Sequence, residues 1–377
     1  MTSLLLHIGS PKAGSSAIQA SLLRAAADLQ QHGLLVLPPN PYRRPLPSGF
    51  LAACYLSVEQ LPRYLAARQR RDPDRFNRDI KDYLQLLADL LRFGHPASAW
   101  RWRARLQRWI ASGLRRPSLP AVLSSEYLFR LSVEQICELR RWFEAQGIRR
   151  FRVLVYVRDP VSAYGSFLQQ WLRLTDDLTH YNPWNWHYPF RQQLEAWASV
   201  FAPAELVVRP FCRDQLCGGS VVGDFYDQCS SWFEQTLVGP EPSSVNESMS
   251  IEELTLLQEL LQAVPPDRRL EADWTVNMSK FLRLLRRQAL ELDCRPAQLQ
   301  PWVRRLVGER HAADLEWLRE QHGITFPGAS PPERLVSLPD ETSHFCLHDL
   351  LVPPTDRARV EQLRQRQLKA VVRDGLI

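Results

Sequence analysis

Short, uninterrupted apolar runs alternate with stretches of helical periodicity in the first half of the chain. The runs are LLLHI at residues 4–8, LLVLPP at 34–39, PAVLSS at 120–125 and FRVLVYV at 151–157. Runs of this kind are typical of strands that are buried on both faces of a parallel sheet. Apolar residues recur with helical spacing at 16–31, 132–147 and 160–174. The alternation predicts an α/β fold in which a central parallel sheet is flanked by helices.

The second half of the chain is predicted to be mainly helical. An irregular aromatic segment, HYNPWNWHYPF, precedes a helix that runs to about Phe201 and a strand at ELVVRPF, and further helices follow from Ser250. We expect residues 1–330 to form one α/β domain with an arginine- and tryptophan-rich helical insertion at about 57–117. Residues 331–377 are expected to be a linker that contains prolines, followed by a last helix near 355–374.

The first apolar run ends in a loop that is suited to binding phosphate. In HIGSPKAGSS, two glycines allow a close approach of the backbone, and the N–H groups at the start of the next helix favour an anion. The predicted phosphate contacts are Pro11, Lys12, Ala13, Gly14, Ser15 and Ser16. The usual triphosphate loop has its lysine directly after the second glycine, where this chain has Ser15. Taken alone, the pattern also fits an ordinary turn between a strand and a helix.

Arg158 and Ser166 form a second candidate phosphate site. Arg158 follows the most apolar run, at the ligand-facing edge of a parallel sheet, and Asp159 and Pro160 are typical of a helix start. Ser166 lies about two turns into that helix, so its hydroxyl returns to the side of the helix cap. An arginine fork and a hydroxyl together suit one phosphate group. The alternative is that Arg158 pairs with Asp159 or a helix end.

Glu126 is the candidate general base. It follows the strand at 120–125, and a carboxylate at a strand end near the phosphate loop is placed to accept a proton from an attacking hydroxyl. The alternative is a structural carboxylate that caps the next helix. Both interpretations stay open on the sequence.

Two of these motifs together resemble the PAPS-dependent sulfotransferases, which use 3′-phosphoadenosine 5′-phosphosulfate. PKAGSSAIQ resembles their 5′-phosphosulfate loop, and VLVYVRDPVSAYGSF resembles their 3′-phosphate motif, with an arginine eight residues before a serine. LEAWASVFAPAELVVRPF and VNESMSIEELTLLQELL resemble bacterial carbohydrate-type members. The likeness covers roughly residues 3–40 and 120–265. It implies a P-loop-like fold and transfer of a sulfuryl group to an acceptor hydroxyl.

The resemblance also implies roles for single residues. Lys12 would contact the bridging oxygen at which the sulfuryl group leaves, Glu126 would be the base, and no metal would be required. The expected acceptor is a glycan or glycolipid. The sequence has serines where the family loop more often has threonine, and it lacks the glycine-rich C-terminal loop of enzymes that act on small phenols and steroids. The second departure argues against such acceptors.

Composition and charge limit the class of protein and the partners that it can have. The chain has 45% hydrophobic and 23% charged residues and a net charge of +6, which excludes a disordered or fibrous protein. Residues 61–117 hold fourteen basic and five acidic side chains. A nucleic-acid surface is one interpretation, but amphipathic helices with a solvated face are favoured, so no nucleic-acid partner is expected. Only four lysines occur in the chain, and one of them is Lys12.

The seven cysteines lack paired spacing, and no signal-type or membrane-spanning apolar segment is found, so we expect a cytoplasmic protein.

HFCLH places His344, Cys346 and His348 at alternate positions, on one face if the segment were a strand, but a second ligand cluster is lacking. The aromatic residues after the second phosphate motif are candidates for contact with the acceptor, although core packing explains most tryptophans: Trp171, Tyr181, Trp184, Trp186, His187 and Tyr188.

Two other functions remain compatible with these motifs. A P-loop kinase would use Glu126 as a carboxylate near Mg²⁺, but the position of Lys12 and the second phosphate site argue against it. A non-catalytic protein that binds glycan or nucleic acid on the same fold would tolerate the loss of Lys12 or Glu126.

Overall fold

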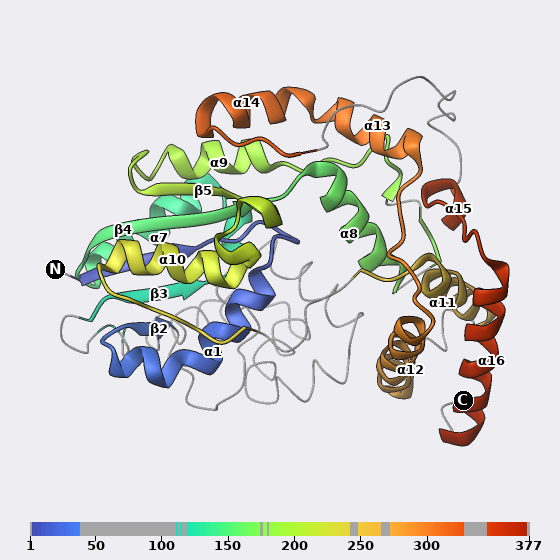
Figure 1. Cartoon of the computed structure of the whole chain (residues 1–377). Coiled ribbons are helices and arrows are strands. Elements are labelled where there is room, and N and C mark those ends of the chain that lie inside the picture. The colour runs from blue at the N-terminus through green and yellow to red at the C-terminus, as the bar shows by residue number, and fades with distance from the viewer. Residues whose placement is uncertain are drawn as a thin grey trace, which may run out of the picture.

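The computed structural model describes residues 2–37, 111, 114, 119–173, 176–178, 181–241, 248–264, 272–327 and 345–374. Its centre is a sheet of five strands in the order β2-β3-β1-β4-β5, and all neighbouring strands are parallel (Figure 1). The strands are β1 (Thr2–His7), β2 (Leu35–Leu37), β3 (Ala121–Ser124), β4 (Ile148–Val157) and β5 (Leu206–Pro210). The predicted α/β fold with a central parallel sheet is confirmed.

Helices cover both faces of the sheet because its strands are apolar on both sides. On one face, α1 (Ser15–Gln31) and α10 (Val221–Phe233) pack against Leu5, Val122 and Leu154. On the other face, α7 (Val133–Ala145), α9 (Phe190–Ala198) and α14 (Ala312–His322) pack against Leu4, Leu6 and Val153. Residues that alternate along a strand point to opposite faces, so neighbouring leucines of β1 contribute to two different cores.

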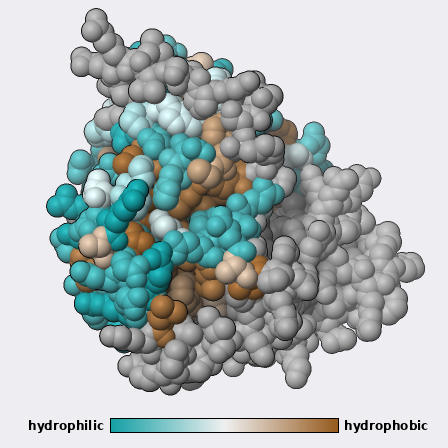
Figure 2. Space-filling model, turned by 90° about the vertical axis from the view of Figure 1, so that its right-hand side faces the viewer, coloured by the Kyte–Doolittle hydropathy of each residue, from teal (hydrophilic) through white to brown (hydrophobic). Residues whose placement is uncertain are grey.

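A second group of helices builds a separate apolar cluster at the end of the molecule where α8 projects from the sheet (Figure 1). Its members are α8 (Pro160–Leu172), α11 (Ile251–Ala263), α12 (Ala272–Glu291), α13 (Pro301–Arg310), α15 (Leu347–Leu350) and α16 (Arg357–Asp374). Seen from this end, the described surface is largely hydrophilic, with hydrophobic side chains visible between the polar ones (Figure 2). α8 contacts α13 and α11, so it joins the sheet to this cluster.

Local sequence signals account for several helix ends. Ser132 and Gln135 form the predicted capping box of α7, because each side chain bonds the backbone N–H of the other. Asp159 accepts a hydrogen bond from the N–H of Ser162 at 2.8 Å, and Pro160 is the first residue of α8. The predicted last helix is present as α16. These ends depend on neighbours in sequence, which is why the sequence alone predicts them.

The strand considered for HFCLH is wrong. Cys346 precedes a short helix, α15, whose first residue is Leu347, and the capping contact between the Cys346 N–H and Asp349 (2.8 Å) stabilises this turn. The described residues contain no group of three side chains that would hold a metal ion, and His344 lies outside them. Apart from residues 111 and 114, the insertion predicted at 57–117 lies outside the described residues, as does the boundary predicted near residue 330.

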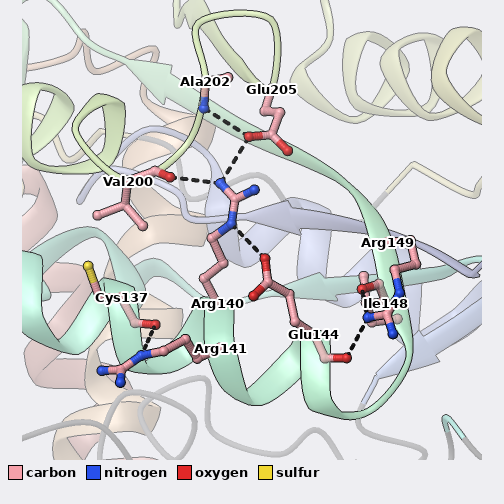
Figure 3. A network of polar contacts seen from close by, with 9 residues as sticks. All are labelled: Cys137, Arg140, Arg141, Glu144, Ile148, Arg149, Val200, Ala202 and Glu205. Carbon is pink, nitrogen blue, oxygen red and sulfur yellow. Dashed lines mark hydrogen bonds and ion pairs between the residues drawn. The ribbon is translucent and has the colours of Figure 1, made fainter.

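Arg140 joins α7 to the segment that leads into β5 (Figure 3). Its guanidinium donates to the carbonyl of Val200 at 2.7 Å and to Glu205 at 3.1 Å, and its Nε donates to Glu144 at 3.0 Å. Glu205 also accepts from the N–H of Ala202 at 2.8 Å. The network fixes the start of β5, and β5 leads directly to Phe211, which contacts the loop described next.

Candidate active site

The loop between β1 and α1 lies at the carboxyl end of the central strand. Lys12 and Gly14 have positive φ angles of 66° and 83°. A Cβ added to Gly14 would lie 2.8 Å from Phe211 and Val221, so only glycine fits between the loop and these side chains. A Cβ added to Gly9 would lie 2.1 Å from the hydroxyl oxygen of Ser15. The two glycines are therefore required by close packing around the loop.

The start of α1 has the features of an anion site. Gly14, at the N-cap, supplies no side-chain hydrogen bond, and the first turn contains no acidic residue. The Oγ of Ser15 is buried and has no hydrogen-bond partner among the described residues, whereas Ser16 is exposed. Backbone N–H groups at a helix start need partners, and a phosphate or sulfate supplies them. The orphaned hydroxyl of Ser15 fits a ligand oxygen.

Lys12 carries a perturbed amine. Burial, and then the positive charges of Arg173 and Arg158, lower its pKa from 10.5 to about 8, while the carboxylate of Glu126 acts in the opposite direction. The carbonyl of Lys12 accepts a hydrogen bond from Nη1 of Arg158 at 3.0 Å. Lys12 and Arg158, which the sequence separates widely, are thus brought together.

The order of the strands in the sheet explains why Lys12 and Arg158 lie close together. β3, β1 and β4 are adjacent, and each ends in one candidate: Glu126 after β3, Lys12 in the loop after β1, and Arg158 after β4. His7 pairs with Ser124 on one side and with Leu154 on the other, so β4 continues past the end of β1 and brings Arg158 to the level of the loop. Strands β2 and β3 lie on one side of β1, and β4 and β5 lie on the other. The crevice at such a reversal of strand order is the usual ligand site of parallel α/β sheets.

Arg158 and Ser166 line the same cavity. Its volume is about 690 Å³, and it lies between α8 and the helices α13 and α14. Burial lowers the pKa of Arg158, and its guanidinium lies over the ring of Phe211, 5.5 Å from the centroid. Asp159 accepts the capping bond of α8 instead of a bond from Arg158. The arginine and the serine thus face one cavity, and their joint contact with a phosphate stays a prediction.

Glu126 is the first residue of a 3₁₀ helix, η1 (Glu126–Arg130), and is half-buried. Its neighbour Ser125 is fully buried, and the N–H of Ser125 bonds the carbonyl of His7 at 2.9 Å, which holds this turn against β1. The effect of Glu126 on the pKa of Lys12 indicates that the two side chains are close. Position and exposure are compatible with a proton acceptor.

Sequence patterns missed several charged residues at the site. Three arginines of the C-terminal helices line the cavity with Arg158: Arg304, Arg305 and Arg319. Arg305 is paired with Glu309 at 2.6 Å, and Arg319 is paired with Glu316. Ser248, within the resemblance segment at 245–261, also lines it. Arginines at helical spacing are indistinguishable from a solvated helix face in the sequence, so no signal identified these residues.

The aromatic residues considered for acceptor contact pack mainly on one another. The ring centroids of Trp171 and Tyr181 are 5.1 Å apart, and those of Tyr164 and Trp186 are 5.2 Å apart. Tyr188 is buried beneath the phosphate loop. Within the described chain, none of the six predicted aromatic residues lines the 690 Å³ cavity. Contact with an acceptor stays a prediction for His187, which is exposed, and for the half-buried members.

His7, under the loop, makes the stability sensitive to acid. Burial lowers its pKa from 6.5 to about 3. As the pH is lowered, the unfolded chain takes up a proton at this histidine near pH 6.5, and the folded protein does not. The free energy of unfolding therefore falls by about 1.4 kcal/mol for each unit by which the pH drops between the two pKa values. Urea unfolding of wild type and His7→Asn from neutral pH to about pH 5 measures the difference in slope. Equal slopes would exclude His7 as the cause.

Comparisons with known proteins give one structural likeness. No protein-family model and no curated protein matches the sequence. Among solved structures, the chain is similar to a crystal structure of a sulfotransferase from Alicyclobacillus acidocaldarius, with a TM-score of 0.34 and 15% sequence identity. The match covers 72% of this chain and 95% of that chain. A likeness this weak assigns no family, so the function is argued from the site.

Proposed function

We propose that the protein is a sulfotransferase that moves a sulfuryl group from 3′-phosphoadenosine 5′-phosphosulfate to a hydroxyl group on a carbohydrate. One observation carries the proposal. Two segments that are suited to anions lie at the ends of adjacent strands and are joined by the hydrogen bond from Arg158 to the carbonyl of Lys12. A donor that is phosphorylated at both its 3′ and 5′ positions matches two such segments, whereas a nucleoside triphosphate needs only one.

The donor would be held by groups that the site leaves available. The N–H groups at the start of α1 and the hydroxyls of Ser15 and Ser16 suit the 5′-phosphate. Arg158 and Ser166 suit the 3′-phosphate, and the cavity they line is large enough for a nucleoside, although neither the loop at 9–16 nor Glu126 lines it. Arg305 and Arg319 are paired with acidic residues of the cavity, so Arg158 and Arg304 would be the cations that complement the ligand.

In the proposed step, the acceptor oxygen forms a bond to sulfur as the bond from sulfur to the bridging oxygen of the donor breaks. The proton of the acceptor hydroxyl goes to Glu126, and the ammonium of Lys12 stabilises the negative charge that develops on the bridging oxygen. With its pKa lowered to about 8, Lys12 is still mostly protonated at neutral pH. The same value lies close to the range in which the ammonium can also give up a proton.

The carbohydrate acceptor and the cytoplasmic location are further parts of the proposal. The acceptor rests on the resemblance of residues 194–211 and 245–261 to carbohydrate-type enzymes. The location is supported by the cysteines: all six within the described residues are free thiols, as is usual in a reducing compartment. Within the same residues, no helix has the length and apolar character needed to cross a membrane.

Nucleotide binding tests the proposal directly. Calorimetry is expected to show tight, metal-independent binding of adenosine 3′,5′-bisphosphate and at least tenfold weaker binding of ATP, with or without Mg²⁺. Tight binding of ATP that requires Mg²⁺ would favour a kinase, and failure of both nucleotides to bind would overturn both enzymes. Transfer of radiolabelled sulfate to glycan, lipid and small-alcohol acceptors would then identify the acceptor class.

Glu126→Gln is expected to lower kcat by about 100-fold, because the amide cannot accept the acceptor proton. Binding of adenosine 3′,5′-bisphosphate should stay within about twofold of wild type, since the base touches the acceptor and not the nucleotide. Glu134→Gln, which changes an exposed carboxylate on α7, is the matched control. Unchanged turnover in Glu126→Gln would remove Glu126 from this role.

A further inference from the structure

Tyr188 connects the two segments that carry the phosphate groups in the proposed function. Its hydroxyl forms a short hydrogen bond with the hydroxyl of Ser10, which lies in the loop after β1. The backbone of Arg158, at the end of β4, opposes the rise that burial causes in the pKa of this hydroxyl, so it lies near Tyr188. Ser10 and Tyr188 are both buried, at 0% and 2% exposure, so no solvent competes for the hydrogen bond between them.

His311 holds the backbone of Tyr188. The N–H of Tyr188 donates to Nε2 of His311 at 3.0 Å, and Nδ1 of His311 faces the carbonyl of Val307 at 2.8 Å. An N–H donor on one side and a carbonyl on the other require a neutral ring with its proton on Nδ1. Both ring nitrogens are therefore satisfied by backbone groups.

The surroundings of His311 keep the ring in this state. It is fully buried between α13 and α14, with the rings of Trp186 and His187 at 5.4 and 5.3 Å between centroids. Burial is the main cause that lowers its pKa; His187 and Arg310 act in the same direction, and Asp314 and the carbonyl of Val307 act against it. Nε2 thus remains a hydrogen-bond acceptor at neutral pH.

We propose that Tyr188, held by His311, is a positioning residue that sets the phosphate loop against the end of β4. The inference rests on the function proposed above, because it assigns these contacts a part in aligning the donor. Gly308, Glu309 and Ala312, next to His311, line the cavity with Arg158 and Ser166. These contacts link the cavity wall to Ser10 through His311 and Tyr188. They hold Lys12 in a fixed position relative to the second phosphate site.

Tyr188→Phe is expected to affect the rate of transfer much more than the binding of the donor. Tyr188→Phe removes one hydroxyl and leaves every predicted ligand contact in the protein, so the donor still binds. Lys12 is then less well fixed, and small errors in alignment reduce the rate far more than the affinity. We expect kcat to fall about 10- to 100-fold, while the dissociation constant for adenosine 3′,5′-bisphosphate changes less than about threefold.

Hydrogen exchange of the loop amides provides a readout that does not depend on activity. In Tyr188→Phe, exchange at residues 9–16 is expected to rise at least about tenfold, with the core strands unchanged. His311→Leu, which removes the acceptor, should give the same result. His311→Gln, whose side-chain oxygen can accept from the N–H of Tyr188, should restore slow exchange and most of kcat. Tyr226→Phe, which removes a buried hydroxyl that contacts Ser21 of α1, is the control.

The outcomes separate the inference from the proposed function. Faster loop exchange in Tyr188→Phe and His311→Leu with rescue in His311→Gln supports the positioning role, even if no transfer is detected. Wild-type loop exchange in Tyr188→Phe overturns it, even if the protein is a sulfotransferase. Equal acceleration across the whole sheet, or the same change in Tyr226→Phe, also overturns it, because a general loss of stability would then explain the result.

Discussion

Lys12→Ala is expected to lower kcat for sulfuryl transfer by about 1,000-fold. In the proposed step, the ammonium of Lys12 is the group that meets the charge developing on the leaving oxygen, and removing one such group costs roughly 3–4 kcal/mol of transition-state stabilisation. Binding of adenosine 3′,5′-bisphosphate should weaken far less, since the helix start, Arg158 and Ser166 remain. The loss should appear in kcat and not in the donor affinity.

The site offers a clean control for this change. Lys12 already has a positive φ of 66°, so alanine carries the same backbone strain and the substitution tests the side chain alone. Lys280→Ala removes an exposed lysine from α12 and changes the net charge by the same amount. Steady-state kinetics and calorimetry on both variants decide the matter. Turnover in Lys12→Ala within tenfold of wild type would contradict the assigned role.

The pH dependence of kcat/KM for the donor extends the same prediction. Burial and two neighbouring arginines lower the pKa of Lys12 to about 8. Because the protonated amine is the active form and kcat/KM follows the ionisation of the free enzyme, kcat/KM for the donor should fall as the pH rises through about 8. Lys12→Arg keeps its charge at every accessible pH, so its residual activity should lack this alkaline limb. An alkaline limb that persists in Lys12→Arg would assign the titration to another group.

Arg158→Ala is expected to weaken donor binding by about 100- to 1,000-fold. The substitution removes a partly buried cation from the cavity and also the hydrogen bond that joins it to the carbonyl of Lys12. Loss of a charge-assisted, two-pronged contact to phosphate is costly because the donor loses both a charge and a geometry. Once donor is bound at saturating concentration, kcat should change less than the affinity does.

Calorimetry with adenosine 3′,5′-bisphosphate and with adenosine 5′-phosphate measures this effect. The variant should lose its preference for the bisphosphate, since only that ligand has a 3′-phosphate. Arg158→Lys should be intermediate, because it keeps the charge and loses the fork. Arg141→Ala, on the exposed face of α7, is the control (Figure 3). A bisphosphate preference that survives in Arg158→Ala would place the 3′-phosphate elsewhere.

The parts that sequence predicts well are those governed by neighbours along the chain. The apolar runs at β1, β3 and β4, the capping box at Ser132 and the helix start at Asp159 are local signals, and the structure confirms them. Arg158 and Ser166 line one cavity, which also agrees with local spacing, because Arg158 directly precedes the cap of α8 and Ser166 lies about two turns further along.

The parts that sequence misses depend on contacts between distant segments. The strand order that brings Glu126, Lys12 and Arg158 together is a property of the whole sheet. Tyr188 was one of six aromatic candidates for the acceptor, and only its bonds to Ser10 and His311 distinguish it from the others. Arg304 reads as an ordinary helical arginine until α13 is packed against α8.

The positive charges around Lys12 have a consequence for the stability of the protein itself. Arg158 and Arg173 both lower the pKa of Lys12, which means that each repels its ammonium in a partly buried place, and the carboxylate of Glu126 offsets only part of this. This repulsion destabilises the folded state and is relieved when an anion lies among them. If the proposed donor binds here, relief of this repulsion contributes to its affinity, and adenosine 3′,5′-bisphosphate should raise the melting temperature of the protein.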